Sequence, residues 1–244
     1  MPSFETRGLA GTCWRLVEAQ HLVATMKLTD TLDEQQILEE LIEASKPPMP
    51  AECRSLDYLL SAPFRYRPYP HGSRFRRANQ MEGVYYAAEA VETAVAEVAF
   101  YRLLFFAESP GTLWPENPAE YTACSARFAA ECGIDLTAPP YTGQAETWCH
   151  PTDYGPCQAL ADAARADGVT AIRYASVRDP GRGANLALLT CRAFASRRIV
   201  DRQTWRIHPG PVGIRAIQEF PTLRLGFARD VFDDPRLAGM VWER

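Results

Sequence analysis

The chain is poor in lysine, and the usual signals for membrane insertion or secretion are missing from it. Only two of its 26 basic residues are lysines, Lys27 and Lys46, so arginine is the default cation and part of any arginine cluster is expected to be ordinary solvated surface. No apolar run approaches the roughly 20 residues that span a bilayer. The N-terminal stretch MPSFETRGLAGTCW is charged and lacks the continuous apolar core of a signal peptide. We therefore expect a cytoplasmic protein with no membrane partner.

Close pairs of metal ligands are also missing. The seven cysteines include no C-x-x-C pair, and the four histidines do not supply the pairs that zinc sites use. Cys149 and His150 are adjacent, but adjacent side chains point apart in regular structure, which argues against a Cys/His dyad. We expect structural or incidental thiols and no metal site. Neither G-x-x-x-x-G-K-[ST] nor G-x-G-x-x-G occurs, which argues against a P-loop or a dinucleotide-binding Rossmann turn.

What the chain does contain is one concentrated basic stretch, PFRYRPYPHGSRFRR, at residues 63–77. It holds five arginines, one histidine and four aromatic residues, and no acid. The whole chain of 244 residues has a net charge of -4, so the cluster is local and does not form the broad basic face of a typical nucleic-acid binder. The candidate anions are a nucleic-acid backbone, a membrane surface and the phosphates of a small molecule.

Residues 31–45 are predicted to form a helix. Thr31 and Glu34 have the spacing of a capping box, and KPPMP ends the helix because proline cannot continue it. The helix carries an apolar stripe made of Ile37, Leu38, Leu41 and Ile42. We interpret residues 1–62 as a helical extension that packs on the core as an amphipathic layer, with a partner-binding arm as the alternative.

The rest of the chain is predicted to be α+β, with strands dominating the second half. Short apolar and alternating runs indicate strands, and longer alanine-rich runs without Gly or Pro indicate helices. The expected elements are a strand at 83–88, a helix at 89–106, an irregular proline-rich region at 107–156, a helix at 157–168 closed by Gly168, strands in VTAIRYAS and NLALLTCRAF, and two or three antiparallel strands within 199–233.

One acid stands out on the predicted helix at 89–106. At helical spacing Glu97 shares a face with Ala90, Ala94 and Tyr101, on a largely apolar helix. A buried acid is costly unless it is paired or hydrogen-bonded. Glu97 therefore either points to solvent or faces a cleft in which its charge is used.

Three segments occur in an order that resembles the RES-domain family. They are the arginines at 65, 67 and 74, then VYYAAEAVETAVAE, then RYASVRDPGRGANLALL. The resemblance runs from about residue 63 to 200, and its pieces are SRF at 73–75, GVYYAA at 83–88, ETAVAE at 92–97 and Ser176 before an N-x-A-L strand. The first 60 residues look like the extension of one longer branch of the family.

The resemblance implies an ADP-ribosyltransferase-like fold: a mixed, largely antiparallel β core with flanking helices, comprising an N-terminal helical extension at 1–62 and the RES domain at 63–244. It also implies a reaction on NAD, which is a substrate here and not a cofactor. Several members are toxins of toxin–antitoxin pairs that cleave the nicotinamide–ribose bond, with water, phosphate or a macromolecule as acceptor. The implied partner is an Xre-like helix-turn-helix antitoxin.

The resemblance also assigns roles to individual residues. Glu97 matches the catalytic glutamate and Ser176 the serine of the family pattern. Arg65 and Arg74 match arginines that bind phosphate, and Tyr86 matches a tyrosine beside the nicotinamide or its ribose.

Two of these positions have alternatives. Arg67 is the alternative to Arg65, because the loop between the arginines is short. Tyr85 is the alternative to Tyr86, because neighbouring strand residues face opposite ways. Arg178, Arg182 and Asn185, which follow the serine, either line the same cleft or lie in a solvated loop, and the loop is the favoured interpretation.

The chemistry of NAD fits these residue types. Arginine pairs with phosphate oxygens in two-point contacts, an aromatic ring can stack on the flat nicotinamide cation, and a carboxylate stabilises an oxocarbenium-like transition state. Two other functions compete with NAD degradation. One is transfer of ADP-ribose to a protein, and the other is a module that stacks single-stranded nucleic acid on arginines and aromatics. The acidic net charge disfavours direct nucleic-acid binding.

Overall fold

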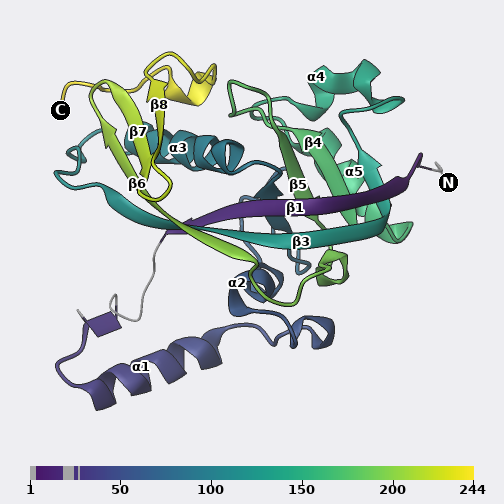
Figure 1. The fold of residues 1–244 in the computed structure, drawn as a ribbon, viewed down its shortest axis with the longest axis horizontal. Helices are drawn as coiled ribbons and strands as arrows, with labels where there is room; N and C mark the ends of the chain where they lie inside the picture. Colours follow the sequence, from purple (N-terminus) through teal and green to yellow (C-terminus); the bar gives the residue numbers. More distant parts are fainter. Residues whose placement is uncertain (1–3, 19–24, 27) are drawn as a thin grey trace.

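In a computed structural model of the chain, residues 4–18, 25–26 and 28–244 are described. They form a mixed α+β fold around one sheet with the strand order β1-β2-β5-β4-β3-β6-β7-β8 (Figure 1). The strands are β1 (Arg7–Glu18), β2 (Tyr85–Ala88), β3 (Ala119–Asp135), β4 (Ala171–Ala175), β5 (Ala184–Leu188), β6 (Asp201–Gly210), β7 (Gly213–Gln218) and β8 (Leu223–Ala228).

The sheet closes on itself through β1. This strand pairs along β3 from Glu18 opposite Tyr121 to Arg7 opposite Gly133, and it also pairs with β2 where Trp14 lies opposite Ala88. On its other side β3 pairs first with β6 and then, in parallel, with β4. The circuit β1–β2–β5–β4–β3 therefore returns to β1, while β6, β7 and β8 form an antiparallel extension.

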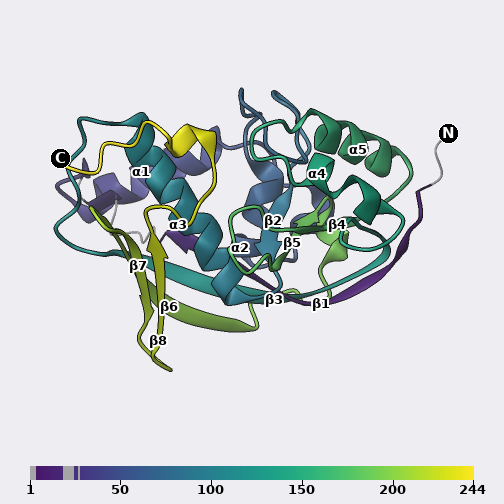
Figure 2. The same ribbon diagram turned by 90° about the horizontal axis from the view of Figure 1, so that it is seen from above.

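The helices lie on one side of the long strands β1 and β3, as Figure 2 shows for α3, α4 and α5. The α-helices are α1 (Leu32–Ser45), α2 (Tyr58–Ser61), α3 (Val91–Glu108), α4 (Ala145–Trp148) and α5 (Gly155–Ala166). Short 3-10 turns are η2 (Ala51–Cys53), η3 (Ala62–Arg65), η4 (Tyr141–Gln144), η5 (Cys191–Ala193) and η6 (Pro235–Leu237).

The main hydrophobic core lies between α3 and the sheet. Val95, Ala99, Phe100 and Leu103 of α3 are fully buried, and they belong to one cluster with Trp205 of β6. Alanine-rich segments favour helix and let it approach a sheet closely. This packing fixes α3, and with it the position of the single acid that α3 carries in its middle.

A second helix, α5, packs against β4 through Cys157, Ala161 and Ala164. It ends at the expected place: Asp167 is the C-cap, and Gly168 follows with φ +77°, a left-handed conformation that glycine adopts without a steric penalty. The predicted helices at 89–106 and 157–168 are confirmed, with small shifts at their ends. The prediction of two or three antiparallel strands in 199–233 is also confirmed, as three.

The N-terminal region departs from its prediction. Residues 7–18 form β1, which is part of the sheet, so a helical extension over 1–62 is wrong for this segment. The helix at 31–45 is confirmed as α1, including the reciprocal capping box between Thr31 and Glu34. However, no residue of α1 is buried, so this helix does not form a packing layer on the core.

The region 107–156 is not irregular as predicted, because it contains β3, the longest strand described. Its buried residues include the small Ala123, Cys124 and Ala126 beside the large Tyr121 and Phe128. Alanine and cysteine carry little strand preference of their own, so strand pairing on both sides decides the conformation here.

Two of the cysteines, which were expected to be structural or incidental thiols, form a disulfide. Cys53, in the turn after α1, is bonded to Cys191, which follows β5. The bond ties the segment before the basic stretch to the sheet. No helix in the described part of the chain combines the length and apolar character needed to cross a membrane.

Candidate functional site

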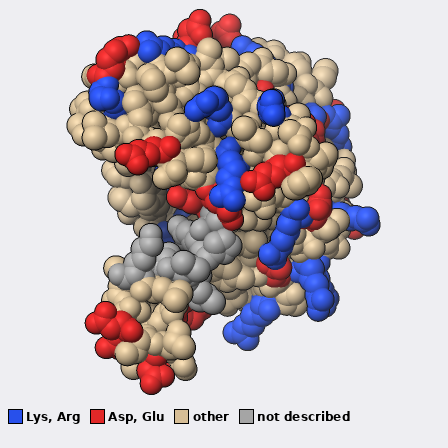
Figure 3. All heavy atoms as spheres, turned by 60° about the vertical axis from the view of Figure 1, so that its left-hand side comes forward, with Lys and Arg blue, Asp and Glu red and all other residues tan. Residues whose placement is uncertain are grey.

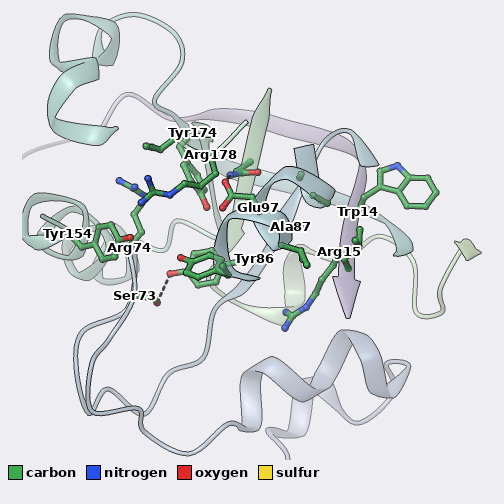
Figure 4. A pocket seen from close by; sticks show the side chains of 17 residues that line it. Trp14, Arg15, Ser73, Arg74, Tyr86, Ala87, Glu97, Tyr154, Tyr174 and Arg178 are labelled. Carbon is green, nitrogen blue, oxygen red and sulfur yellow. Dashed lines mark hydrogen bonds between the residues drawn. The ribbon is translucent and has the colours of Figure 1, made fainter. Parts of the chain in front are cut away.

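A pocket of about 320 Å³ lies beside the N-terminal half of α3 (Figure 4). Segments far apart in the sequence form the wall of the pocket. The pocket lies where β1 pairs with β2 and closes the sheet. The lining residues are Trp14, Arg15, Leu16, Ser73, Arg74, Tyr86, Ala87, Ala88, Ala94, Glu97, Val98, Tyr101, Tyr154, Tyr174, Val177, Arg178 and Asn185.

Glu97 is the one acid among the residues that line this pocket, and the described residues donate hydrogen bonds to only one of its two carboxylate oxygens. Its Oε1 accepts a hydrogen bond from Ser176 Oγ at 2.7 Å and another from Asn185 Nδ2 at 2.6 Å. No residue in the described ranges donates to Oε2. The carboxylate therefore has a fixed orientation, with one oxygen committed to the protein and the other available to a ligand.

Ser176 lies behind Glu97 and does not line the pocket. Its side chain is buried, and its Oγ also accepts the backbone N–H groups of Arg178 at 3.2 Å and Asp179 at 2.9 Å. A hydroxyl with these partners cannot reach a ligand. The structure thus brings Ser176 to Glu97 Oε1, the oxygen that Asn185 of β5 also contacts.

The two candidate tyrosines face opposite sides of β2. Tyr86 lines the pocket, where its hydroxyl bonds to Ser73 Oγ at 2.8 Å and accepts the Phe75 N–H at 2.9 Å. Burial raises the pKa of the Tyr86 phenol, so it stays protonated. Tyr85 is fully buried on the other side, with its ring centroid 4.9 Å from that of Phe194. Of the two alternatives, only Tyr86 is brought to the pocket.

Arg74 reaches the pocket from the basic stretch. Its guanidinium donates to the carbonyl of Trp148 at 2.7 Å and to that of His150 at 3.0 Å, and it lies 4.7 Å from the ring centroid of Tyr154. These contacts fix its direction without neutralising it, because no acid in the described residues forms an ion pair with it. Arg74 thus supplies an uncompensated positive charge to the pocket wall.

Arg65 and Arg67 are not brought to the pocket. Arg65 pairs with Glu43 and donates through Nε to the Pro47 carbonyl at 3.1 Å, while Arg67 Nε donates to the Ser45 carbonyl at 3.1 Å. The last turn of α1 contains no basic residue of its own. The two arginines therefore supply the positive charge and the donors that the C-terminal end of a helix attracts.

Three pocket residues, Trp14, Arg15 and Leu16, come from β1 and were missed by sequence reasoning. Trp14 and Arg15 line the wall, and Figure 4 shows them on the opposite side of Glu97 and Tyr86 from Arg74. No described acid pairs with the side chain of Arg15. The sequence offers little signal for this strand, because three consecutive exposed residues separate buried Leu9 from buried Cys13 and break the period of two. Arg15 and Arg74 thus line opposite sides of the pocket, and the Arg15 guanidinium lies 5.0 Å from the ring centroid of Tyr85, which is buried on the other side of β2.

Arg178 and Asn185 are not in a solvated loop as expected. Both are buried, whereas Arg182 is exposed. Arg178 forms an ion pair of 2.6 Å with Asp234, donates to the Pro151 carbonyl at 2.7 Å, and lies 3.9 Å from the ring centroid of Phe100. The backbone N–H of Arg178 donates to Ser176 Oγ, and Ser176 donates to Glu97. Arg178 and Ser176 therefore link Asp234, in the segment after β8, to the Glu97 carboxylate.

The sequence profile of the RES domain matches residues 49–209, about two thirds of the chain, so the chain belongs to the RES domain family. It is similar to a chain in the crystal structure of the M. tuberculosis MbcT–MbcA toxin–antitoxin complex, with 16% identity and a TM-score of 0.49, over 84% of this chain and 87% of that one. A search of curated proteins gave no match. The pocket residues Trp14 and Arg15 and the ion-pair partner Asp234 lie outside the matched range.

The ion pair between Arg178 and Asp234 makes the stability of the fold dependent on pH. Burial alone would raise the pKa of the Asp234 carboxyl, but hydrogen bonds from Arg236 and the charges of Arg178 and Arg236 outweigh it, so the pKa is lowered. Such a carboxyl stabilises the folded state above its unfolded pKa of about 3.9, and this contribution is lost as pH falls through the folded pKa.

We therefore expect Asp234→Asn to reduce the free energy of unfolding at pH 7 by about 3 kcal/mol, since one partner of a buried pair is removed. The deficit relative to wild type should shrink below about pH 4, where the wild-type carboxyl is itself protonated. Thermal denaturation from pH 3 to pH 8 measures this, with Asp233→Asn, an exposed neighbour, as the control. An equal deficit at both ends of the range would contradict the role of the ion pair.

Proposed function

We propose that the protein degrades NAD by cleaving its nicotinamide–ribose bond, and that it is the toxin of a toxin–antitoxin pair. The observation that carries the proposal is the Glu97 carboxylate, fixed through Oε1 by Ser176 and Asn185 in a pocket with aromatic walls and arginines on opposite sides. Membership of the RES domain family supports the same reaction. An ADP-ribosyltransferase-like relationship of the fold is part of this proposal.

The reaction places a specific demand on the pocket. The bond from ribose C1′ to the nicotinamide nitrogen breaks with both electrons leaving on nicotinamide, which departs as a neutral molecule. Positive charge is left on the ribose, as in glycoside hydrolysis. A carboxylate oxygen held in advance stabilises that charge without reorganising during the step. Glu97 Oε2 is the oxygen that meets this demand.

The aromatic lining suits the leaving group. Tyr86, Tyr101, Tyr154 and Tyr174 all contribute to the pocket wall. The nicotinamide ring of NAD is a flat cation, and aromatic faces attract cations. The ring loses its charge as the bond breaks, so this attraction acts on the substrate more than on the released nicotinamide.

The acceptor attacks C1′ with an electron pair and loses a proton. Water gives ADP-ribose, inorganic phosphate gives a phosphorylated ADP-ribose, and a protein side chain gives an ADP-ribosylated protein. The first two define a glycohydrolase or a phosphorylase, and the third defines an ADP-ribosyltransferase, which is the alternative. A cytoplasmic location and an Xre-like helix-turn-helix antitoxin are the further expectations that accompany the proposal.

The structure supports binding of single-stranded nucleic acid by the basic stretch less well than it supports NAD cleavage. Two arginines of the basic stretch, Arg65 and Arg67, bind the end of α1, and two more, Arg74 and Arg76, are buried. Few of its charges are therefore free to follow a phosphate backbone.

The first test is direct. We expect the purified chain to convert NAD to free nicotinamide. Proton NMR measures this conversion in the presence and in the absence of phosphate. A phosphate requirement with a phosphorylated product identifies a phosphorylase, and ADP-ribose formation without phosphate identifies a glycohydrolase. Unchanged NAD after prolonged incubation of antitoxin-free protein would contradict the proposed function.

A second test concerns Arg15, which lines the pocket and for which we propose a contact with the diphosphate of NAD. We expect Arg15→Met to lower kcat/KM for NAD about 10- to 100-fold, because a charge-assisted hydrogen bond to phosphate is lost. Nicotinamide riboside, which has no phosphate, should be used equally by the variant and the wild type. Arg224→Met, at an exposed strand position outside the pocket, is the matched control. A parallel loss on both substrates would show that Arg15 has no phosphate-specific role.

A further inference from the structure

The helix α1 exposes an apolar face that the fold does not use. It stands apart from the sheet in Figure 1, and no residue of it is buried. The exposed fractions of Ile37, Leu41 and Ile42 are 57%, 64% and 39%. Contiguous exposed apolar surface on a folded chain usually marks an interaction site. The helix also lies outside the range matched by the RES domain profile, and it contributes no residue to the pocket.

The face has a clear chemical pattern. The aliphatic residues of the stripe recur at intervals of three and four, so they share one side of the helix. Helical spacing of 100° per residue puts Asp33 and Glu40 beside one border of the stripe and Glu39 beside the other, whereas Glu34 falls within it and Glu43 on the opposite face. Five acids and no base thus accompany the stripe. They are Asp33, Glu34, Glu39, Glu40 and Glu43. In Figure 3 the projecting lobe shows red acidic side chains.

The helix is held in place at its C-terminal end. Arg67 binds the Ser45 carbonyl, and Arg65 binds Glu43 and the Pro47 carbonyl just beyond the helix. Lys46 Nζ bonds to Glu43 at 2.8 Å and to the Tyr58 hydroxyl at 3.3 Å. Arg65 and Arg67 come from the body of the protein and Lys46 is the C-cap of the helix itself, and together they fix one end of α1. The apolar face is therefore presented in a defined direction.

The charge of α1 decides which occupant fits. An anionic membrane or a nucleic acid is repelled by acidic borders, and a second copy would bring two acidic borders together. A helix with an apolar face and basic borders complements both the apolar stripe and the acids of α1. Its apolar side chains pack against the stripe, and its basic side chains meet the acids at the rim. We propose that α1 docks an amphipathic helix of a partner protein whose apolar face is bordered by lysine and arginine.

The proposal is tested with a defined probe. A fluorescent 20-residue peptide of leucine and lysine, patterned as an amphipathic helix, is titrated with the full chain and followed by anisotropy. A second peptide has the same leucines and glutamate in place of lysine. We expect saturable binding of the lysine peptide, weakened by salt, and no binding of the glutamate peptide.

Variants of α1 locate the binding. Ile37→Ala combined with Leu41→Ala preserves helix propensity and should weaken binding at least tenfold. Glu39→Gln combined with Glu40→Gln should weaken it and reduce its dependence on salt. Leu113→Ala, which removes a leucine that is 71% exposed elsewhere, should leave it unchanged.

Three results would overturn the proposal. The first is no saturable binding of the lysine peptide, and the second is equal binding by wild type and both α1 variants. The third is a wild-type dimer in sedimentation that Ile37→Ala with Leu41→Ala abolishes, since the face would then belong to a second copy. None of these readouts involves NAD, so they are independent of the proposed reaction.

Discussion

The double hydrogen bond to Glu97 Oε1 is the contact on which the organisation of the pocket depends. It joins the acid of α3 to Ser176, after β4, and to Asn185 on β5. A carboxylate on an otherwise apolar helix is costly to bury without such donors. The same two donors that satisfy this requirement also fix the direction of the second oxygen. The same two hydrogen bonds therefore make burial of the carboxylate tolerable and orient its second oxygen in the pocket.

This contact is supported from outside the matched RES domain. The segment after β8 holds Arg178 through Asp234, and the backbone of Arg178 holds Ser176. At the other end of the chain, β1 closes the sheet and places Arg15 in the pocket wall. The site is thus assembled from both ends of the sequence, and closure of the sheet through β1 brings them together.

The sequence predicted the parts of the fold that are decided locally. The three predicted helices and the three C-terminal strands follow from local sequence patterns, and the turn at Gly168 follows from residue type. It did not predict β1 or β3, because the small residues of β3 become strand only through pairing with neighbours. Such pairing is a long-range property that a local pattern does not contain.

For the site, the order of motifs led to Glu97, Tyr86 and Arg74, which the structure brings into one pocket; their chemical roles remain predictions. The basic stretch was misleading at Arg65 and Arg67. An arginine that binds a ligand and one that satisfies a helix end look alike in a sequence, and only the position of α1 distinguishes them.

The central claim is that the negative charge of Glu97 acts in the reaction and not in the fold. It is tested most directly by measuring turnover of NAD and the melting temperature on the single variant Glu97→Gln. The glutamine keeps an oxygen that can accept from Ser176 and Asn185, so the melting temperature should stay level or rise. Loss of the charge should lower kcat about 100- to 1000-fold while NAD still binds. Normal turnover together with a depressed melting temperature would contradict the claim.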